Sequence, residues 1–417
     1  MNRTVNNSEV FRGVNEKQKS CYDLKKVQTP CFVFEEDQFV ASLSDMQAAL
    51  RRRFPSAFVA YSVKTNPLPY ILHTVYDNGG FAEVTSADEF RLARYTGFPV
   101  DRIIYNGPMK DRETFYQAMA GGACVNLENY RELIWLHDYT GPKNGGVGVR
   151  LNINLGEISP EDASPDQEHS RFGFSFSSDD FLRVVKEVEN CGYLVRGIHA
   201  HRTSKTRSLQ VYERICHYIE HVIHNLNLHL SYIDIGGGFC GSVPGRPGYD
   251  DYFRVMQENL HLTAEQTLIV EPGSALIAEP VEFVTTIFDI KELNGIKICQ
   301  CDGSRWDVDP LFQHDTHQYK VIHAKDQEIT SDNSDGKKRQ LLTGFTCLEN
   351  DKIMYIEKEK VHVNDRIIFY RKGAYSLCMT PNFIRLLPRV YARKKDALIL
   401  VRDAWSISEA TQKCRLL

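Results

Sequence analysis

The sequence predicts an α/β protein whose larger part is a closed (β/α)8 TIM barrel. Between residues 58 and 274, short runs rich in β-branched and aromatic residues alternate with longer amphipathic stretches, which is the pattern of parallel strands joined by helices. Eight such runs occur, and eight strand and helix pairs are the number that closes a barrel. An open, doubly wound parallel sheet with a similar number of strands is the alternative.

Each expected strand is short and is followed by a turn or by an amphipathic stretch. The eight expected strands cover residues 58–65, 80–86, 103–108, 123–129, 146–153, 194–201, 232–238 and 268–274. Helices are expected at residues 86–95, 111–120, 130–137, 178–190 and 209–225. Before them the chain predicts a strand at Cys31 to Phe34 and a helix from Asp37 to Arg53.

After Glu279 the pattern changes to strand-like runs with few helical spacers, which is typical of a mostly antiparallel β domain. The runs cover residues 281–290, 297–303, 318–324, 352–358, 366–373 and 397–403. The very polar stretch 325–339 is expected to be a mobile surface loop. The domain prediction is therefore an arm and strand that join the β domain (1–36), a barrel (37–276) and a C-terminal β domain (277–417).

Composition excludes several classes of partner. The 417 residues carry a formal net charge of -4, so no basic excess favours nucleic acid or an anionic membrane. No apolar run is long enough for a transmembrane helix. The polar N-terminus lacks the apolar core of a signal peptide, and the eleven cysteines show no CxxC spacing. We therefore expect reduced thiols, a cytoplasmic location and small-molecule chemistry.

Polar residues stand at the carboxyl ends of the expected strands, where a barrel collects its reactive groups. These residues are Lys64, Ser86, Asn106, Arg150, His201, Gly236 to Gly238 and Glu271. Any one of them has a structural explanation: a solvated loop lysine, a salt-bridge arginine, a satisfied core histidine or a tight glycine turn. Their convergence on one rim is harder to explain without a ligand.

The chemistry of these residues indicates pyridoxal 5'-phosphate. Partial desolvation of Lys64 at a strand end would lower its pKa and free the amine to condense with an aldehyde. Gly236, Gly237 and Gly238 would bring backbone N–H groups to a phosphate, although they form neither a Walker loop nor a GxGxxG fingerprint. Glu271 would pair with the protonated pyridine nitrogen, and His201 could lie against the ring.

With these residues, the sequence resembles a known family, the pyridoxal-phosphate decarboxylases of the alanine-racemase-like fold, which includes diaminopimelate, ornithine and arginine decarboxylases. The resemblance runs from about Pro30 to Pro388. It rests on the order and spacing of AYSVKTN (Lys64), EVTSADE (Glu83, Glu89), YNGPMK (Asn106, Lys110), VRLNIN (Arg150), SRFGF (Phe172, Gly173), HAHRTS (His201, Ser204), DIGGGF (Gly236 to Gly238), EPGS (Glu271), CLEND (Cys347, Asp351) and KGAYS (Gly373, Ala374, Tyr375).

The resemblance implies a role for each of these residues in an amino-acid decarboxylase. Lys64 would carry the internal aldimine, His201 would stack on the ring and Glu271 would pair with the ring nitrogen. The phosphate would be held by Gly236 to Gly238, Ser204 and Tyr375, with Arg150 also at the cofactor. No metal is expected.

Family members are similar in forming head-to-tail homodimers with shared active sites. The partner's Cys347 would then complete each site and protonate the quinonoid at Cα after CO2 leaves. A thiol with an ordinary pKa of about 8.5 can supply a proton near neutral pH.

Three departures from the family pattern concern the substrate. Ser274 stands where Glu-Pro-Gly is usually followed by arginine, and Leu348 follows the cysteine where diaminopimelate enzymes have glutamate. By the same comparison, Asp309, before Pro310, replaces the arginine that grips a distal carboxylate. An anion there inverts the charge preference, so a distal amine or guanidinium fits better. Arg305 in the same loop could still hold a carboxylate.

The predicted substrate is accordingly a basic amino acid such as lysine, ornithine or arginine, or a pathway-specific amino acid of siderophore or antibiotic biosynthesis. Diaminopimelate decarboxylation in lysine biosynthesis is the alternative.

Functions of other classes are less well supported. His199 and His201 would place two imidazoles on one face of a strand, as in a metal-dependent barrel hydrolase, but the further ligands of such enzymes are not found. A non-catalytic binding protein would be expected to lose Lys64 or Cys347, and both are present. A racemase shares the barrel and the lysine, whereas CLEND and KGAYS favour decarboxylation.

Overall fold

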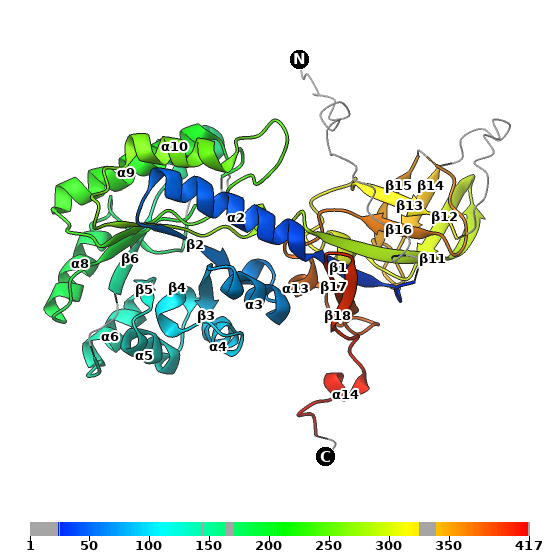
Figure 1. Ribbon diagram of the computed structural model, residues 1–417, viewed down its shortest axis with the longest axis horizontal. Helices are drawn as coiled ribbons and strands as arrows, with labels where there is room; N and C mark the ends of the chain where they lie inside the picture. Colours follow the sequence, from blue (N-terminus) through cyan, green and yellow to red (C-terminus); the bar gives the residue numbers. More distant parts are fainter. Residues whose placement is uncertain are drawn as a thin grey trace. The chain divides into compact units, whose positions relative to one another are not determined.

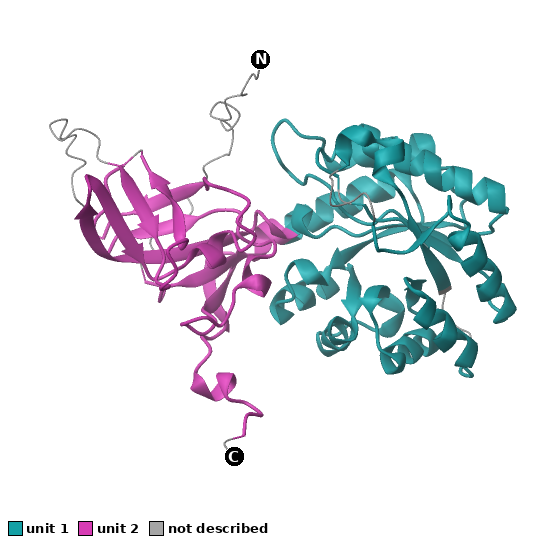
Figure 2. Cartoon of the chain, turned by 180° about the vertical axis from the view of Figure 1, so that it is seen from behind, with its two compact units in different colours: residues 1–12, 40–276 teal, residues 13–39, 277–417 magenta. Residues whose placement is uncertain are grey.

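The chain divides into two compact units (Figure 2). The structure is a computed structural model that describes residues 24, 26–142, 146–163, 170–202, 204–324, 339–357 and 359–415. Unit 1 contains residues 40–276, and unit 2 contains residues 277–415 with the described residues up to Phe39. The N-terminal arm before Leu24 and residues 325–338 of the loop predicted at 325–339 lie outside the described residues.

Unit 1 is a closed barrel of eight parallel strands, which confirms the predicted fold class and excludes the open sheet. The strands follow the order β2-β3-β4-β5-β6-β8-β9-β10, and β10 pairs back with β2. Their bounds are β2 (Ala57–Ser62), β3 (Phe81–Ser86), β4 (Ile103–Met109), β5 (Cys124–Leu127), β6 (Gly146–Asn152), β8 (Gly197–His199), β9 (Tyr232–Asp234) and β10 (Thr267–Val270). The short β7 (Phe174–Ser175) pairs with β6 and was not predicted.

Helices alternate with the strands and surround them (Figure 1). They are α2 (Glu36–Arg53), α3 (Pro69–Asp77), α4 (Ala87–Tyr95), α5 (Arg112–Gly121), α6 (Tyr130–Asp138), α7 (Leu155–Ile158), α8 (Asp180–Asn190), α9 (Leu209–Leu226), α10 (Tyr249–Asn259) and α11 (Ser274–Ile277), with one-turn 3-10 helices η1 (Val63–Thr65), η2 (Val100–Arg102) and η3 (Pro160–Asp162). Local capping fixes their starts: the Ser86 hydroxyl accepts from the Glu89 amide at 3.1 Å, and Asp111 accepts from the Thr114 amide at 2.7 Å. The predicted helices therefore begin close to where the sequence places them.

A buried tyrosine fills the interior between neighbouring strands. Tyr232 packs with Ala60, Ile104 and Ile269 from three other strands. The position on β8 that faces this ring must be glycine, because a Cβ at Gly197 would lie 2.1 Å from the Tyr232 ring. The barrel is thus a packed core, and its ligands must bind at a rim.

Unit 2 is built on a nine-stranded, mostly antiparallel sheet. Its strands are β1 (Cys31–Glu35), β11 (Val281–Leu293), β12 (Ile296–Cys301), β13 (Tyr319–Ile322), β14 (Gln340–Thr343), β15 (Lys352–Ile356), β16 (Arg366–Phe369), β17 (Arg389–Lys394) and β18 (Ala397–Arg402). The short helices are α12 (Arg305–Val308), α13 (Ser376–Met379) and α14 (Ile407–Ala410). β1 lies antiparallel to β11 and parallel to β17, and β12 lies parallel to β14.

Two strands of unit 2, β14 and β17, were not predicted from the sequence. β14 directly follows the polar stretch, and β17 reads RVYARK, with three basic residues in six. Both are held by pairing with neighbours far away in the sequence, which local propensity does not record. Within the described part of the chain, no helix has the length and hydrophobicity needed to cross a membrane.

Candidate active site

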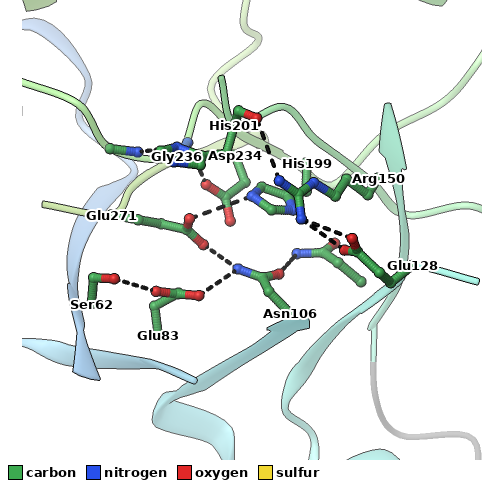
Figure 3. A network of polar contacts seen from close by, with 12 residues as sticks. Ser62, Glu83, Asn106, Glu128, Arg150, His199, His201, Asp234, Gly236 and Glu271 are labelled. Atoms are coloured by element: carbon green, nitrogen blue, oxygen red, sulfur yellow. Dashed lines mark hydrogen bonds and ion pairs between the residues drawn. The ribbon is translucent and has the colours of Figure 1, made fainter. Parts of the chain in front are cut away.

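The carboxyl ends of the parallel strands of unit 1 form one rim, and the polar side chains of that rim gather in groups linked by hydrogen bonds and ion pairs (Figure 3). These groups contain most of the unit 1 residues predicted from strand ends. They also contain several acidic and amide side chains that the strand-end argument did not single out.

Lys64 lies in the one-turn helix η1, directly after β2. Its Nζ donates to Glu83 Oε2 at 2.6 Å and to Ser62 Oγ at 2.7 Å. Glu83 is almost fully buried, whereas the Lys64 side chain is 37 % exposed. Lys64 is therefore not a freely solvated loop lysine: it is an ion-paired amine that still faces open space at the rim.

Amide side chains connect this ion pair to Glu271, at the end of β10. Asn106 Nδ2 donates to Glu83 Oε1 at 3.3 Å and to Glu271 Oε1. Asn126 Nδ2 in turn donates to Asn106 Oδ1 at 2.7 Å, and the Tyr232 hydroxyl donates to Asn126 Oδ1 at 2.7 Å. All these side chains are buried, so the network fixes the orientation of both carboxylates.

Glu271 is held in its ionised form. Burial alone would raise the pKa of Glu271. Three neighbours lower it by more: the His199 ring, 3.4 Å away, a hydrogen bond from Asp234 and the charge of Lys64. The pKa of Glu271 therefore lies below its usual range. Burial and the neighbouring Glu271 raise the pKa of Asp234 well above its usual range. Asp234 thus carries the proton of the pair and leaves Glu271 as the anion.

His201 is held as a neutral imidazole. Its Nδ1 accepts the Gly237 amide at 3.0 Å, which leaves Nε2 as the protonated nitrogen. Burial lowers the pKa of His201 to about 3, and the charges of Lys64 and Arg150 act in the same direction. The prediction that His199 and His201 share one strand face is wrong, because β8 ends at His199 and the glycine turn binds the His201 ring.

The glycine turn follows β9 and leaves no room for side chains. Gly236 and Gly238 have positive φ angles of 71° and 98°, which glycine adopts without strain. A Cβ at Gly237 would lie 2.3 Å from the carbonyl oxygen of Glu271. The Gly236 and Gly237 amides already donate to Asp234 Oδ1 at 2.9 Å and to His201 Nδ1 at 3.0 Å. The lack of side chains still lets a bound anion approach the backbone of the turn, where the Gly238 N–H follows.

Arg150, at the end of β6, is buried and already compensated. Its guanidinium donates to both oxygens of Glu128 at 2.9 Å and lies 4.7 Å from the centre of the Phe172 ring. Ser204, in the loop after β8, accepts the Arg207 amide through its hydroxyl at 2.8 Å. Ser274 is the first residue of α11, after β10.

The remaining predicted site residues belong to unit 2. Cys347 and Leu348 are exposed in the turn between β14 and β15. Buried Asp351 fixes that turn by accepting the amides of Thr346, at 3.0 Å, and Arg305, at 2.8 Å. Tyr375 has a positive φ of 62° at the start of α13 and is partly exposed.

Asp309 and Arg305 contact one another. Arg305 Nη2 lies 3.7 Å from Asp309 Oδ2, and the His314 amide donates to Asp309 Oδ2 at 2.8 Å. Asp309 is only 6 % exposed. The sequence predicted Asp309 as the anchor of the distal group and Arg305 as the alternative. In the structure the two side chains lie together, so a ligand would meet both charges.

Sequence reasoning missed Asp234, Asn126 and Glu128 as members of the site. Asp234 stands two residues before the glycine turn, so its place at the end of a strand was a usable signal. Glu128 follows β5, whose register with β6 pairs Leu127 with Val149, one residue before Arg150. That signal could be read only once the strand order was known.

Two kinds of ligand suit such a network. Donor atoms of His199, Asp234 and Glu271 lie within 4.8 Å of one another, which is a spacing a metal ion could use. Pyridoxal phosphate suits more of the residues: an amine facing open space, an ionised buried carboxylate and a glycine turn without side chains. The residues present therefore fit that cofactor.

Comparison with known families identifies a match over residues 39–278, more than half of the chain, to the pyridoxal-binding domain of pyridoxal-dependent decarboxylases. Among curated proteins, a diaminopimelate decarboxylase of Bacteroides thetaiotaomicron is 24% identical over 382 residues, which are 88% of this chain and 96% of that protein.

Solved structures share the fold. The diaminopimelate decarboxylase of M. jannaschii in complex with L-lysine matches with a TM-score of 0.82 at 20% identity, over 95% of this chain and 94% of that one. The lysine/ornithine decarboxylase of Vibrio vulnificus in complex with putrescine matches with a TM-score of 0.71 at 21% identity, over 89% and 96% of the two chains.

Proposed function

We propose, on the premise that the chain belongs to the pyridoxal-dependent decarboxylases, that it removes the α-carboxylate of an amino acid as CO2. Pyridoxal 5'-phosphate is the cofactor of this family and of this chain. When bound, it supplies an aldehyde for an amine and an electron-withdrawing ring for the charge left on the α-carbon. The observation that carries the proposal is the buried network that joins Lys64 to the ionised Glu271.

Three residues of the rim would serve the reactive part of the cofactor. Lys64 Nζ would hold its aldehyde carbon, with Glu83 orienting the amine at 2.6 Å. Glu271, ionised in the fold, would hold a proton on the ring nitrogen. The neutral His201 imidazole would lie against the ring face without adding a charge to it.

The phosphate would be bound mainly by uncharged donors. We assign it to the turn Gly236, Gly237 and Gly238, in which the first two amides already donate to Asp234 and His201 and Gly238 would supply the N–H. The Ser204 hydroxyl and the Tyr375 hydroxyl would complete the site. Arg150 would act at the cofactor as a compensated cation, because Glu128 accepts two bonds from its guanidinium.

The proton that replaces the carboxylate would come from Cys347. Its exposed position on a fixed turn of unit 2 suits a group that must meet the α-carbon of a substrate. We propose that the enzyme is a head-to-tail homodimer in which the partner subunit's Cys347 completes each active site.

The domain assignment is part of the same proposal. We assign residues 37–276 to the cofactor-binding barrel, and residues 277–417 with the arm 1–36 to the β domain. The division of the chain into two compact units between Leu276 and Ile277 supports the second boundary.

The substrate we propose first is a basic amino acid such as lysine, ornithine or arginine, or a pathway-specific amino acid, with Asp309, Arg305, Ser274 and Leu348 as its contacts. A second candidate is meso-diaminopimelate, which the named relatives favour. The paired Arg305 and Asp309, 3.7 Å apart, also fit its distal end, because that end carries both a carboxylate and an ammonium group.

Release of CO2 from a panel of L-lysine, L-ornithine, L-arginine and meso-diaminopimelate tests the proposal. Activity on a basic amino acid supports the first substrate, and activity on meso-diaminopimelate alone supports the second. Activity on neither class contradicts both of these and leaves the pathway-specific amino acid. Lys64→Ala should abolish both CO2 release and the visible cofactor absorption that borohydride removes. Retention of either by Lys64→Ala contradicts the role of this lysine.

The Asp309→Asn variant tests whether the Asp309 carboxylate binds the substrate or only stabilises the loop. If Asp309 binds the substrate, KM for a basic substrate should rise by about tenfold, which corresponds to about 1.4 kcal/mol, with little change in kcat. Asp315→Asn is the matched control, since Asp315 is fully exposed and lies 3.9 Å from Arg305. Equal KM values for both variants would refute the anchor role.

A further inference from the structure

We propose that unit 2 carries a binding site for a divalent transition-metal ion, best suited to Zn²⁺, formed by His323, His362 and Asp365. The site lies at one end of the β13–β16 pair and uses none of the residues assigned to decarboxylation. A test of this metal site is therefore independent of the proposed decarboxylase function.

Strand pairing brings the three residues together from two separate segments. His323 directly follows β13, and Asp365 directly precedes β16. The two strands are antiparallel, with Ile322 opposite Arg366, so His323 and Asp365 face one another across the ladder. His362 lies three residues before Asp365, on the turn that leads into β16.

The donor atoms have the spacing that a small cation needs. Asp365 Oδ2 lies 2.9 Å from His323 Nδ1 and 3.5 Å from His362 Nδ1, and the three ligand atoms all lie within 4.8 Å of one another. Tetrahedral zinc with bonds of about 2.0 Å holds its ligand atoms about 3.3 Å apart. The two distances to Asp365 Oδ2 are within a few tenths of an ångström of this value. The two imidazoles, which lie within 4.8 Å of one another, would approach by up to about 1.5 Å when the ion binds.

The carboxylate is held in place before any ion binds. Asp365 is buried, and it accepts the Ala324 amide at 3.1 Å and the His362 amide at 2.8 Å. The backbone of the turn is tied to β11, since the Ile287 amide donates to the Asp365 carbonyl at 2.9 Å. Such bonds around a ligand orient it and strengthen metal binding.

A simple hydrogen bond between His323 and Asp365 leaves one feature unexplained. His362 Nδ1 is shielded from solvent and makes no hydrogen bond within the described part of the chain, although buried ring nitrogens are normally satisfied. A shared ion would satisfy it together with His323 Nδ1 and the carboxylate. Two imidazole nitrogens and one carboxylate select zinc or a neighbouring transition metal over Mg²⁺ or Ca²⁺.

The ion would join the end of β13 to the turn before β16, and water would complete its coordination. Glu359, whose carboxylate lies 3.9 Å from His323 Nε2, adds negative charge beside the site. Because an ion that binds only the folded chain stabilises it by mass action, zinc should raise the unfolding temperature of the protein.

The test titrates chelator-treated, cofactor-loaded enzyme with Zn²⁺ by calorimetry, and with Co²⁺ by visible absorption. Binding of one ion per chain, with a tetrahedral Co²⁺ spectrum that lacks thiolate charge-transfer bands, is the expected result. His362→Ala should weaken zinc binding by about tenfold or more, because even loss of an outer partner costs about 10–100-fold. The zinc-dependent rise in unfolding temperature should be lost with it.

His137→Ala is the matched control. His137 is an exposed histidine whose ring lies 3.4 Å from Asp138, so it forms a histidine–aspartate pair without a second imidazole. Zinc affinity should be unchanged in that variant. His362→Gln, which keeps the size of the side chain, replaces His362→Ala if the latter fails to fold. Absence of zinc binding, a thiolate spectrum, or equal effects of His362 and His137 substitutions would overturn the proposal.

Discussion

Asn106→Leu should separate the electrostatic role of the buried network from its role in packing. Leucine keeps nearly the shape of asparagine but removes the two bonds that Asn106 donates to Glu83 and Glu271 and the one that it accepts from Asn126. A hydrogen bond to a charged group contributes about 1.5–3 kcal/mol, and the 3.3 Å bond to Glu83 belongs at the low end. After the gain from apolar burial, we expect the free energy of unfolding to fall by about 2–4 kcal/mol.

The loss should also change how activity depends on pH. Because the folded pKa of Glu271 lies below its ordinary value, its ionised form contributes stability that is present above the unfolded carboxyl pKa of about 4.3 and is lost as pH falls through the folded pKa. Without the Asn106 donor the folded pKa rises toward the unfolded value, so this contribution to stability becomes smaller and its loss is complete at a higher pH. The acidic limb of the kcat profile should move upward, and kcat should fall about 10–100-fold.

Asn126→Leu is the control for this experiment. It makes the same substitution one step along the network and removes the bonds to Asn106 and Tyr232. Both carboxylates keep their Asn106 donor, so stability should fall while the acidic limb of kcat stays in place. Urea unfolding and pH-dependent CO2 release measure the two effects. The reasoning is refuted if Asn106→Leu keeps the wild-type pH profile, or if Asn126→Leu moves it equally far.

Two further predictions concern buried titratable groups. Lys110→Met removes the partner of Glu132, whose oxygens both lie 3.1 Å from Lys110 Nζ, and should cost about 3–5 kcal/mol of unfolding free energy. Burial already raises the pKa of Glu132, so this cost should be smallest at acid pH, where Glu132 is protonated, and should grow as pH rises. In urea unfolding, the double variant Lys110→Met/Glu132→Leu should recover most of the lost free energy. No recovery would contradict the ion-pair explanation. The pKa of His201 is lowered from 6.5 to about 3, so the unfolded chain takes up a proton first and stability should fall as pH drops through that window. His201→Phe should reduce this fall in pH-dependent thermal unfolding, and an unchanged slope would show that His201 is not its source.

Local patterns in the sequence are enough to predict the barrel and the chemical character of its rim. Helix and strand patterns depend on neighbours a few positions away, so the alternation through residues 58–274 could be read directly. Strand ends in a parallel barrel must share one face, which is why Lys64, Arg150 and Glu271 could be placed together before any coordinates were known.

Which of these groups compensate one another depends on the tertiary structure. The Arg150–Glu128 pair follows from β5 lying beside β6. The unequal protonation of Asp234 and Glu271 follows from the neighbours of Glu271, because His199 and Lys64 lower its pKa against the effect of burial. Both depend on side chains that are far apart in the sequence, so composition and local pattern carry no record of them.

Unit 2 shows the same division between sequence and fold. The sequence offered Asp309 and Arg305 as alternative anchors, and the fold places the two side chains in contact. His323 and His362 drew no attention as separate residues, and the antiparallel pairing of β13 with β16 brings them together at Asp365. Residue types are fixed by the sequence, whereas the charge that a ligand meets is set by which side chains the fold brings into contact.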